Sequence, residues 1–130
     1  MKRIAFSLII GLASITAFAQ STSEAPIQNI STDSTVVYRL FATRNMYTFI
    51  KLNTRNGQMW QVQWDTKSKY RFETILSDIS LVNENEEKNG RFFLYPTQNI
   101  YNFILLDQIN GKTWQVQWGN AEDRFVTPIN

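Results

Sequence analysis

Short runs rich in β-branched and aromatic residues recur from residue 36 to the end of the chain, separated by Asn, Asp, Gly and Pro. Within many of these runs apolar and polar residues alternate. A period of two is typical of β-strands, because successive side chains point to opposite faces of a sheet. The pattern predicts strands over 36–41, 46–52, 58–64, 70–76, 91–95, 100–107, 112–118 and 123–129. We therefore expect an all-β fold.

The strand pattern reflects an internal duplication. An offset of 54 residues places Gly57 on Gly111 and Trp60 on Trp114. A constant offset of this kind is the signature of a repeated structural unit. Each copy is expected to form a four-stranded antiparallel meander within one domain. The predicted boundaries are 36–77 for the first repeat, 78–90 for an acidic connector and 91–130 for the second repeat.

The central hairpin of each repeat has a defined turn and register. Each turns at an Asn-Gly dipeptide, whose glycine is expected at positive φ because tight hairpin turns require it. The length of the loop places Phe49 opposite Val62 in the first copy. The same register places Phe103 opposite Val116 in the second copy. These pairs lie on the same face as the tryptophans, so each repeat has an aromatic face.

The aromatic face is the expected core. It carries all four tryptophans, at equivalent positions of the two copies: Trp60, Trp64, Trp114 and Trp118. A symmetric core needs both copies alike, whereas a ligand site needs only one, so burial is favoured over an exposed sugar platform. The two meanders are expected to pack together as one pseudo-twofold barrel or sandwich. The barrel is favoured because it leaves no edge strands.

A β-propeller blade offers a further comparison for the meander. The strand–turn–strand of a blade often contains a pattern similar to Asp-x-x-x-Gly-x-x-Trp, which begins here at Asp107. Two blades cannot close a ring. A propeller arrangement would therefore require self-association of the chain.

The repeat carries the motif Asn-x-x-x-Phe-Ile-x-Leu followed by Asn-Gly-x-x-Trp-Gln-Val-Gln-Trp, complete in the second copy between Asn99 and Trp118. This motif resembles a repeat in small secreted bacterial proteins that are uncharacterised. The resemblance covers both copies and thus most of the chain. It implies a shared fold and brings no known catalytic residues.

The first 19 residues have the features of a secretory signal peptide. Lys2 and Arg3 precede an apolar run, and a small-x-small cleavage site ends at Ala19. The Ser/Thr-rich stretch 20–35 that follows is expected to be a flexible arm. We therefore expect a protein exported to the periplasm or the cell exterior, with no transmembrane segment in the mature chain.

Composition excludes several classes of function. The chain has 13 basic and 11 acidic residues, and loss of Lys2 and Arg3 with the signal peptide would balance the charges, so nucleic acid is not an expected partner. Histidine and cysteine are absent, which removes the usual metal ligands and every catalytic triad that needs either residue. We expect no enzyme, no cofactor and no metal site.

Three polar residues of the repeats are given structural roles. Asp107 is expected to make an Asx turn at its hairpin. Arg71 and Arg124 each precede a phenylalanine and are expected to pair with carboxylates at strand edges.

The remaining candidates for a site are amides and indoles of the repeated motif. The predicted ligand-binding residues are Gln61, Gln63, Gln115, Gln117, Trp64 and Trp118. Together they could line a polar groove for a carbohydrate or an extended peptide, but a Gln-x-Gln array is more often simply the solvent-exposed face of a strand. The sequence thus favours a monomeric, non-catalytic binding or interaction module whose partner is a protein or a glycan. The alternative is a structural or assembly protein of the cell envelope.

Overall fold

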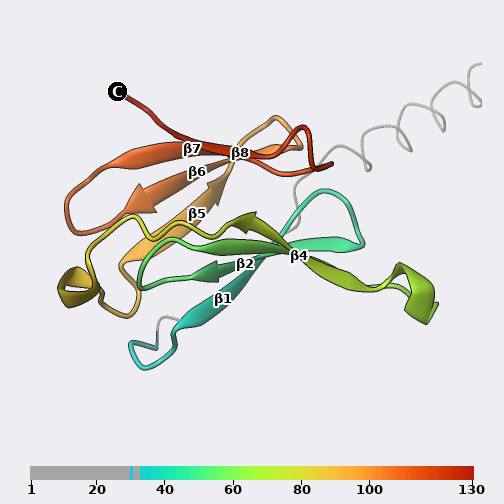
Figure 1. Cartoon of the computed structure of the whole chain (residues 1–130), viewed down its shortest axis with the longest axis horizontal. Helices are drawn as coiled ribbons and strands as arrows, with labels where there is room; N and C mark the ends of the chain where they lie inside the picture. Colours follow the sequence, from blue (N-terminus) through green and yellow to red (C-terminus); the bar gives the residue numbers. More distant parts are fainter. Residues whose placement is uncertain (1–29, 31–32) are drawn as a thin grey trace, which may run out of the picture.

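The computed structural model describes residue 30 and residues 33–130, which form two four-stranded antiparallel sheets (Figure 1). The strands of sheet 1 are β1 (Tyr38–Ala42), β2 (Thr48–Asn53), β3 (Met59–Gln63) and β4 (Phe72–Ser77). The strands of sheet 2 are β5 (Phe92–Pro96), β6 (Asn102–Asp107), β7 (Thr113–Gln117) and β8 (Phe125–Pro128). Each sheet is a meander in chain order, so the predicted all-β fold with two four-stranded antiparallel meanders is confirmed. The expected signal peptide and almost all of the expected arm lie outside the described residues.

Two short 3₁₀ turns complete the described secondary structure, Ser68–Tyr70 between β3 and β4 and Glu84–Glu86 in the connector. None of the described helical segments is long and apolar enough to span a membrane.

The hairpin registers predicted from the sequence are confirmed. Phe49 pairs with Val62 in sheet 1, and Phe103 pairs with Val116 in sheet 2. Gly57 and Gly111 have φ of 86° and 80°, the left-handed conformation that an Asn-Gly turn needs.

The two sheets lie one above the other as two layers (Figure 1). β2 approaches β5, and β4 approaches β8, so the layers are close on both flanks. Strand pairing within the described residues links no strand of one sheet to the other, which is the sandwich alternative rather than a closed barrel. The core between the layers consists of Phe41, Ile50, Leu52, Met59, Leu76, Phe92, Leu94, Phe103, Leu105, Trp114, Val116 and Trp118.

The two sheets bury opposite faces of the repeat. Sheet 1 buries Ile50 and Leu52, whose equivalents in sheet 2, Ile104 and Leu106, lie on its outer face. Sheet 2 buries the aromatic face that the sequence assigned to the core. In a twofold arrangement equivalent faces would meet, whereas here the inner face of one sheet corresponds to the outer face of the other. The two sheets are therefore stacked with equivalent faces pointing in the same direction.

Because of this stacking, the tryptophans of the two sheets differ in solvent exposure. Trp114 and Trp118 are 7% and 6% exposed, so the core prediction is confirmed for sheet 2. Trp60 is only half-buried and Trp64 is 42% exposed, so the same prediction is wrong for Trp64. The physical reason is that sheet 1 turns its other face toward the partner sheet, which leaves its indoles on the outside.

Candidate functional site

A cleft of about 570 Å³ opens at the end of the molecule where β3 and β7 finish. It is the largest of the described cavities, and both repeats contribute to its walls. The lining residues are Asn45, Thr48, Gln61, Gln63, Phe72, Tyr101, Gln117, Trp118, Gly119, Asn120, Asp123 and Arg124. Four of the six predicted ligand-binding residues are among them, so the structure brings most of that set together.

Gln61 lines the cleft and joins the two sheets. Its side chain is 5% exposed, and its Oε1 accepts hydrogen bonds from the Gly119 backbone N–H (2.8 Å) and from Arg124 Nε (3.1 Å). Arg124 Nε also donates to the Gly119 carbonyl at 2.8 Å. Gln61 thus fixes the loop after β7, and its oxygen is already occupied by two donors.

Gln63 and Gln117 hold equivalent loops in the two repeats. Gln63 Nε2 donates to the Tyr70 carbonyl at 2.9 Å, and Gln117 Nε2 donates to the Asp123 carbonyl at 2.9 Å. Both amide nitrogens therefore position the strand-to-strand loop beside them. The Gln63 Oε1 receives no hydrogen bond from the described residues, so it remains able to accept one from a ligand.

Aromatic side chains form the apolar part of the cleft. The Trp118 ring is buried, its Nε1 donates to the Ile100 carbonyl (3.0 Å), and Tyr101 packs on it with ring centroids 5.1 Å apart. Tyr101 and Phe72 are 47% and 46% exposed. The cleft therefore combines a rigid indole wall with two accessible aromatic rings.

Two predicted site residues lie elsewhere. Gln115 is on the outer face of sheet 2, where its Nε2 donates to Asn102 Oδ1 at 2.8 Å. Trp64 is at the edge of the outer face of sheet 1, with its Nε1 donating to the Met46 carbonyl at 2.8 Å. Their placement follows from the stacking, because each belongs to the face that its own sheet turns away from the core.

The loop that follows β7 was missed by sequence reasoning. Asn120, Asp123 and Arg124 line the cleft from this loop, whose turn begins at Gly119 with φ of 142°. The only available signal was the Arg-Phe pair repeated in both copies. The role expected for its arginines was wrong, because Arg71 and Arg124 donate to backbone carbonyls and form no ion pair with a described carboxylate.

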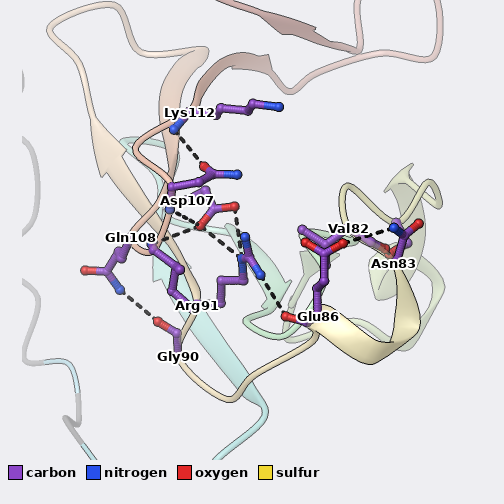
Figure 2. A network of polar contacts seen from close by, with 11 residues as sticks. Val82, Asn83, Glu86, Gly90, Arg91, Asp107, Gln108 and Lys112 are labelled. Atoms are coloured by element: carbon purple, nitrogen blue, oxygen red, sulfur yellow. Dashed lines mark hydrogen bonds and ion pairs between the residues drawn. The ribbon is translucent and has the colours of Figure 1, made fainter.

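A second polar cluster lies at the opposite end of the sheets, around a buried ion pair (Figure 2). Arg91 Nε lies 3.0 Å from both carboxylate oxygens of Asp107, and the two side chains are 6% and 0% exposed. Arg91 Nη1 also donates to the Glu86 carbonyl at 2.7 Å. Asp107 Oδ1 accepts the Ile109 and Asn110 backbone N–H groups, which confirms its Asx role.

That ion pair is structural. Its carboxylate faces its own guanidinium and two backbone donors, and none of the described cavities includes either residue. The first repeat has Val37 and Asn53 at the equivalent positions, and Asn53 Oδ1 makes the matching bond to the Arg55 N–H at 3.0 Å. The same turn therefore forms without the charges, and the pair serves the second repeat only.

The described residues contain no group of three or more acidic, His or Cys side chains placed to hold a metal ion. No protein-family model matches the chain, and neither the curated proteins nor the solved structures contain a significant match.

Proposed function

We propose that the protein is an exported, non-catalytic binding module that takes a carbohydrate in the cleft between the ends of the two sheets. The observation that carries this proposal is the convergence of amide, guanidinium and aromatic groups on one open cavity. Export rests on the signal-peptide pattern of the first 19 residues. The absence of His and Cys from the sequence supports a role without catalysis.

The polar groups of the cleft suit neutral hydroxyls. Amide side chains such as Gln63 and Asn120 both donate and accept hydrogen bonds, as sugar hydroxyls do. Arg124 uses Nε for the fold, while its two terminal nitrogens make no hydrogen bond to the described residues. They can donate to a ligand. The accessible rings of Phe72 and Tyr101 offer flat apolar surfaces against which a pyranose ring can stack.

An extended peptide fits this location less well. Peptides that bind to sheets usually add a strand to an exposed edge, where backbone groups supply most of the affinity. The cleft lies at the ends of strands rather than along an exposed strand edge. We therefore favour carbohydrate over peptide as the ligand.

The test compares two tyrosines in equivalent positions. Tyr101 lines the cleft, whereas Tyr47 stacks on Trp64 outside it with the same centroid separation of 5.1 Å. A panel of neutral oligosaccharides is titrated by calorimetry into the wild-type protein and into the Tyr101→Ala and Tyr47→Ala variants. We expect Tyr101→Ala to abolish binding and Tyr47→Ala to preserve it. Equal losses in both variants, or no binding by the wild type, would contradict the cleft as a carbohydrate site.

A second candidate function, a structural or assembly protein of the cell envelope, is supported by a separate observation. The outer face of sheet 1 exposes large apolar side chains that include Tyr38, Leu40 and Ile75. Apolar surface of this kind is typical of protein–protein contacts.

A further inference from the structure

The outer face of sheet 1 is an apolar surface without a partner in the described structure. Tyr38, Leu40 and Ile75 are 54%, 55% and 52% exposed, and Phe49, Trp60 and Val62 are half-buried between them. A soluble protein seldom leaves so many large apolar side chains on one side of a sheet in water. A partner that covers this face is therefore expected.

The duplication indicates what kind of surface covers this face, because the equivalent face of sheet 2 is already covered within the chain. Tyr38, Leu40, Phe49, Trp60 and Val62 correspond to Phe92, Leu94, Phe103, Trp114 and Val116. All five residues of sheet 2 belong to the core, where they meet the inner face of sheet 1. The molecule therefore shows, within one chain, which surface packs on a face of this type.

The outer face of sheet 2 is the matching surface. Tyr95, Ile104 and Leu106 are the equivalents of Phe41, Ile50 and Leu52, which form the inner face of sheet 1. Tyr95 is 43% exposed, and Ile104 and Leu106 are half-buried. One chain thus presents both halves of the sheet–sheet contact on its two outer faces.

We propose that a second copy of this chain packs the outer face of its sheet 2 onto the outer face of sheet 1. The contact repeats between molecules the stacking that joins the two sheets within one molecule. It goes beyond the proposed binding function and does not depend on the cleft. It replaces the monomer favoured by the sequence.

Polar groups at the end of the outer face of sheet 1 have the arrangement that joins the two sheets within the chain. Arg71 Nε donates to the Asp65 carbonyl at 2.8 Å, just as Arg124 Nε donates to the Gly119 carbonyl at 2.8 Å. In the second repeat Gln115 is the equivalent of Gln61, and its Oε1 receives no hydrogen bond from the described residues. Gln115 of one molecule can therefore accept from Arg71 of the next, as Gln61 accepts from Arg124 within the chain.

One charged pair distinguishes the outer face of sheet 1 from the inner face of sheet 2. Lys51 and Glu73 form an ion pair on the outer face of sheet 1. Sheet 2 has Leu105 and Val126 at these places, because Glu73 pairs with Val62 as Val126 pairs with Val116. The Lys51 ammonium also lies 4.9 Å from the centroid of the Trp60 ring. Covering this pair removes charge from water, which opposes association. The pair thus makes the contact between molecules weaker than the one within the chain.

The proposed contact joins two different faces, so it is heterologous. An open assembly of any size keeps one free outer face at each of its two ends. It therefore either closes into a ring or grows as a filament. The mass of the assembly must therefore rise with protein concentration beyond that of a dimer, unless closure occurs at two chains.

The test blocks each face separately on the mature protein. Leu40→Glu/Ile75→Glu places charge on the outer face of sheet 1, and Ile104→Glu places charge on the outer face of sheet 2. If the Ile104→Glu variant does not melt cooperatively, Tyr95→Glu replaces it. Ile109→Glu changes an exposed turn residue and serves as the control. Mass is measured by light scattering over roughly 1–500 µM, the range of weak interfaces.

We expect the wild type and Ile109→Glu to associate and each blocked variant to remain monomeric. Mixing the two blocked variants should give a heterodimer and nothing larger, because one intact face of each kind remains. A monomeric wild type would overturn the proposal. It would also be overturned if the sheet 1 variant alone lost association, since that indicates contact between like faces, or if the folded mixture stayed monomeric.

A gain-of-function variant provides an independent check. Lys51→Leu/Glu73→Val gives the outer face of sheet 1 the residues of the inner face of sheet 2. We expect association at least about tenfold tighter than wild type, since no buried ion pair then opposes it. Unchanged or weaker association in a folded variant would contradict the proposed role of the face.

Discussion

Trp64 and Trp118 have the same local structure and opposite environments. Each indole donates a hydrogen bond to a backbone carbonyl 18 residues earlier, and each ring packs on a tyrosine at a centroid separation of 5.1 Å. Yet Trp64 is 42% exposed and Trp118 only 6%. The repeat therefore determines the conformation of both residues, and the stacking of the sheets determines which one is buried.

This difference predicts unequal effects of the same substitution. Trp118→Ala should lower the free energy of unfolding by about 3–5 kcal/mol, as deletions of buried aromatic side chains do. Trp64→Ala should cost about 1 kcal/mol, chiefly the contact of its ring with tyrosine. Chemical denaturation of both variants measures the two values. Equal losses would mean that the outer face of sheet 1 is covered under the conditions used.

The hairpin glycines are also expected to differ. Both have positive φ, so alanine at either position costs about 1–2 kcal/mol from the left-handed conformation alone. A Cβ at Gly57 would lie 2.8 Å from Leu81 Cδ1, whereas one at Gly111 would meet no atom within 4 Å. Gly57→Ala should therefore destabilise the protein more than Gly111→Ala. Denaturation midpoints with unchanged slopes would provide the comparison, and the reverse order would contradict the packing of Leu81 on the turn.

The sequence predicts the local structure of this protein well because local rules determine it. Alternation identifies each strand, the Asn-Gly turns set the hairpin registers, and the pairs of Phe49 with Val62 and Phe103 with Val116 follow. The face that each sheet buries could not be predicted in this way. Both faces of the repeat are partly apolar, so the choice depends on contacts between segments far apart in the chain.

The candidate site shows the same division between local and distant information. The Gln-x-Gln motifs identify amides on one face of each repeat, and four of the six predicted residues do line the cleft. Gln61 becomes a buried link between the sheets and Gln115 stays outside, although the motif is identical in the two copies. The sequence predicts Arg124 within the strand over 123–129, but it lies in the loop before β8, where strand alternation does not give the direction of its side chain.

The two equivalent glutamines provide a further prediction. Gln61→Ala removes the acceptor for the Gly119 N–H and Arg124 Nε. A buried polar group left without a hydrogen-bond partner lowers the free energy of unfolding by about 1–3 kcal/mol. Gln115→Ala at low protein concentration should change stability by less than about 0.5 kcal/mol, as most surface substitutions do. Thermal melts of both variants test this difference. A larger loss in Gln115→Ala would show that the outer face of sheet 2 contributes to the fold of the single chain.

The buried ion pair of the second repeat allows a test in which the first repeat supplies the replacement residues. Asp107→Ala leaves the Arg91 guanidinium buried without its carboxylate, and breaking such a pair typically costs about 3–5 kcal/mol. Arg91→Val/Asp107→Asn instead introduces the residues of the first repeat, Val37 and Asn53, whose turn forms without charges.

We expect the double variant to recover most of the stability lost in Asp107→Ala, because no charge remains buried and the asparagine can still accept the backbone N–H groups of the turn. Urea denaturation of the wild type and both variants measures the recovery. Arg91→Val alone separates the two contributions, since it leaves the Asp107 carboxylate with backbone donors only. A double variant as unstable as Asp107→Ala would show that the second repeat needs the ion pair itself, through the Arg91 contact with the Glu86 carbonyl that ties the connector to β5.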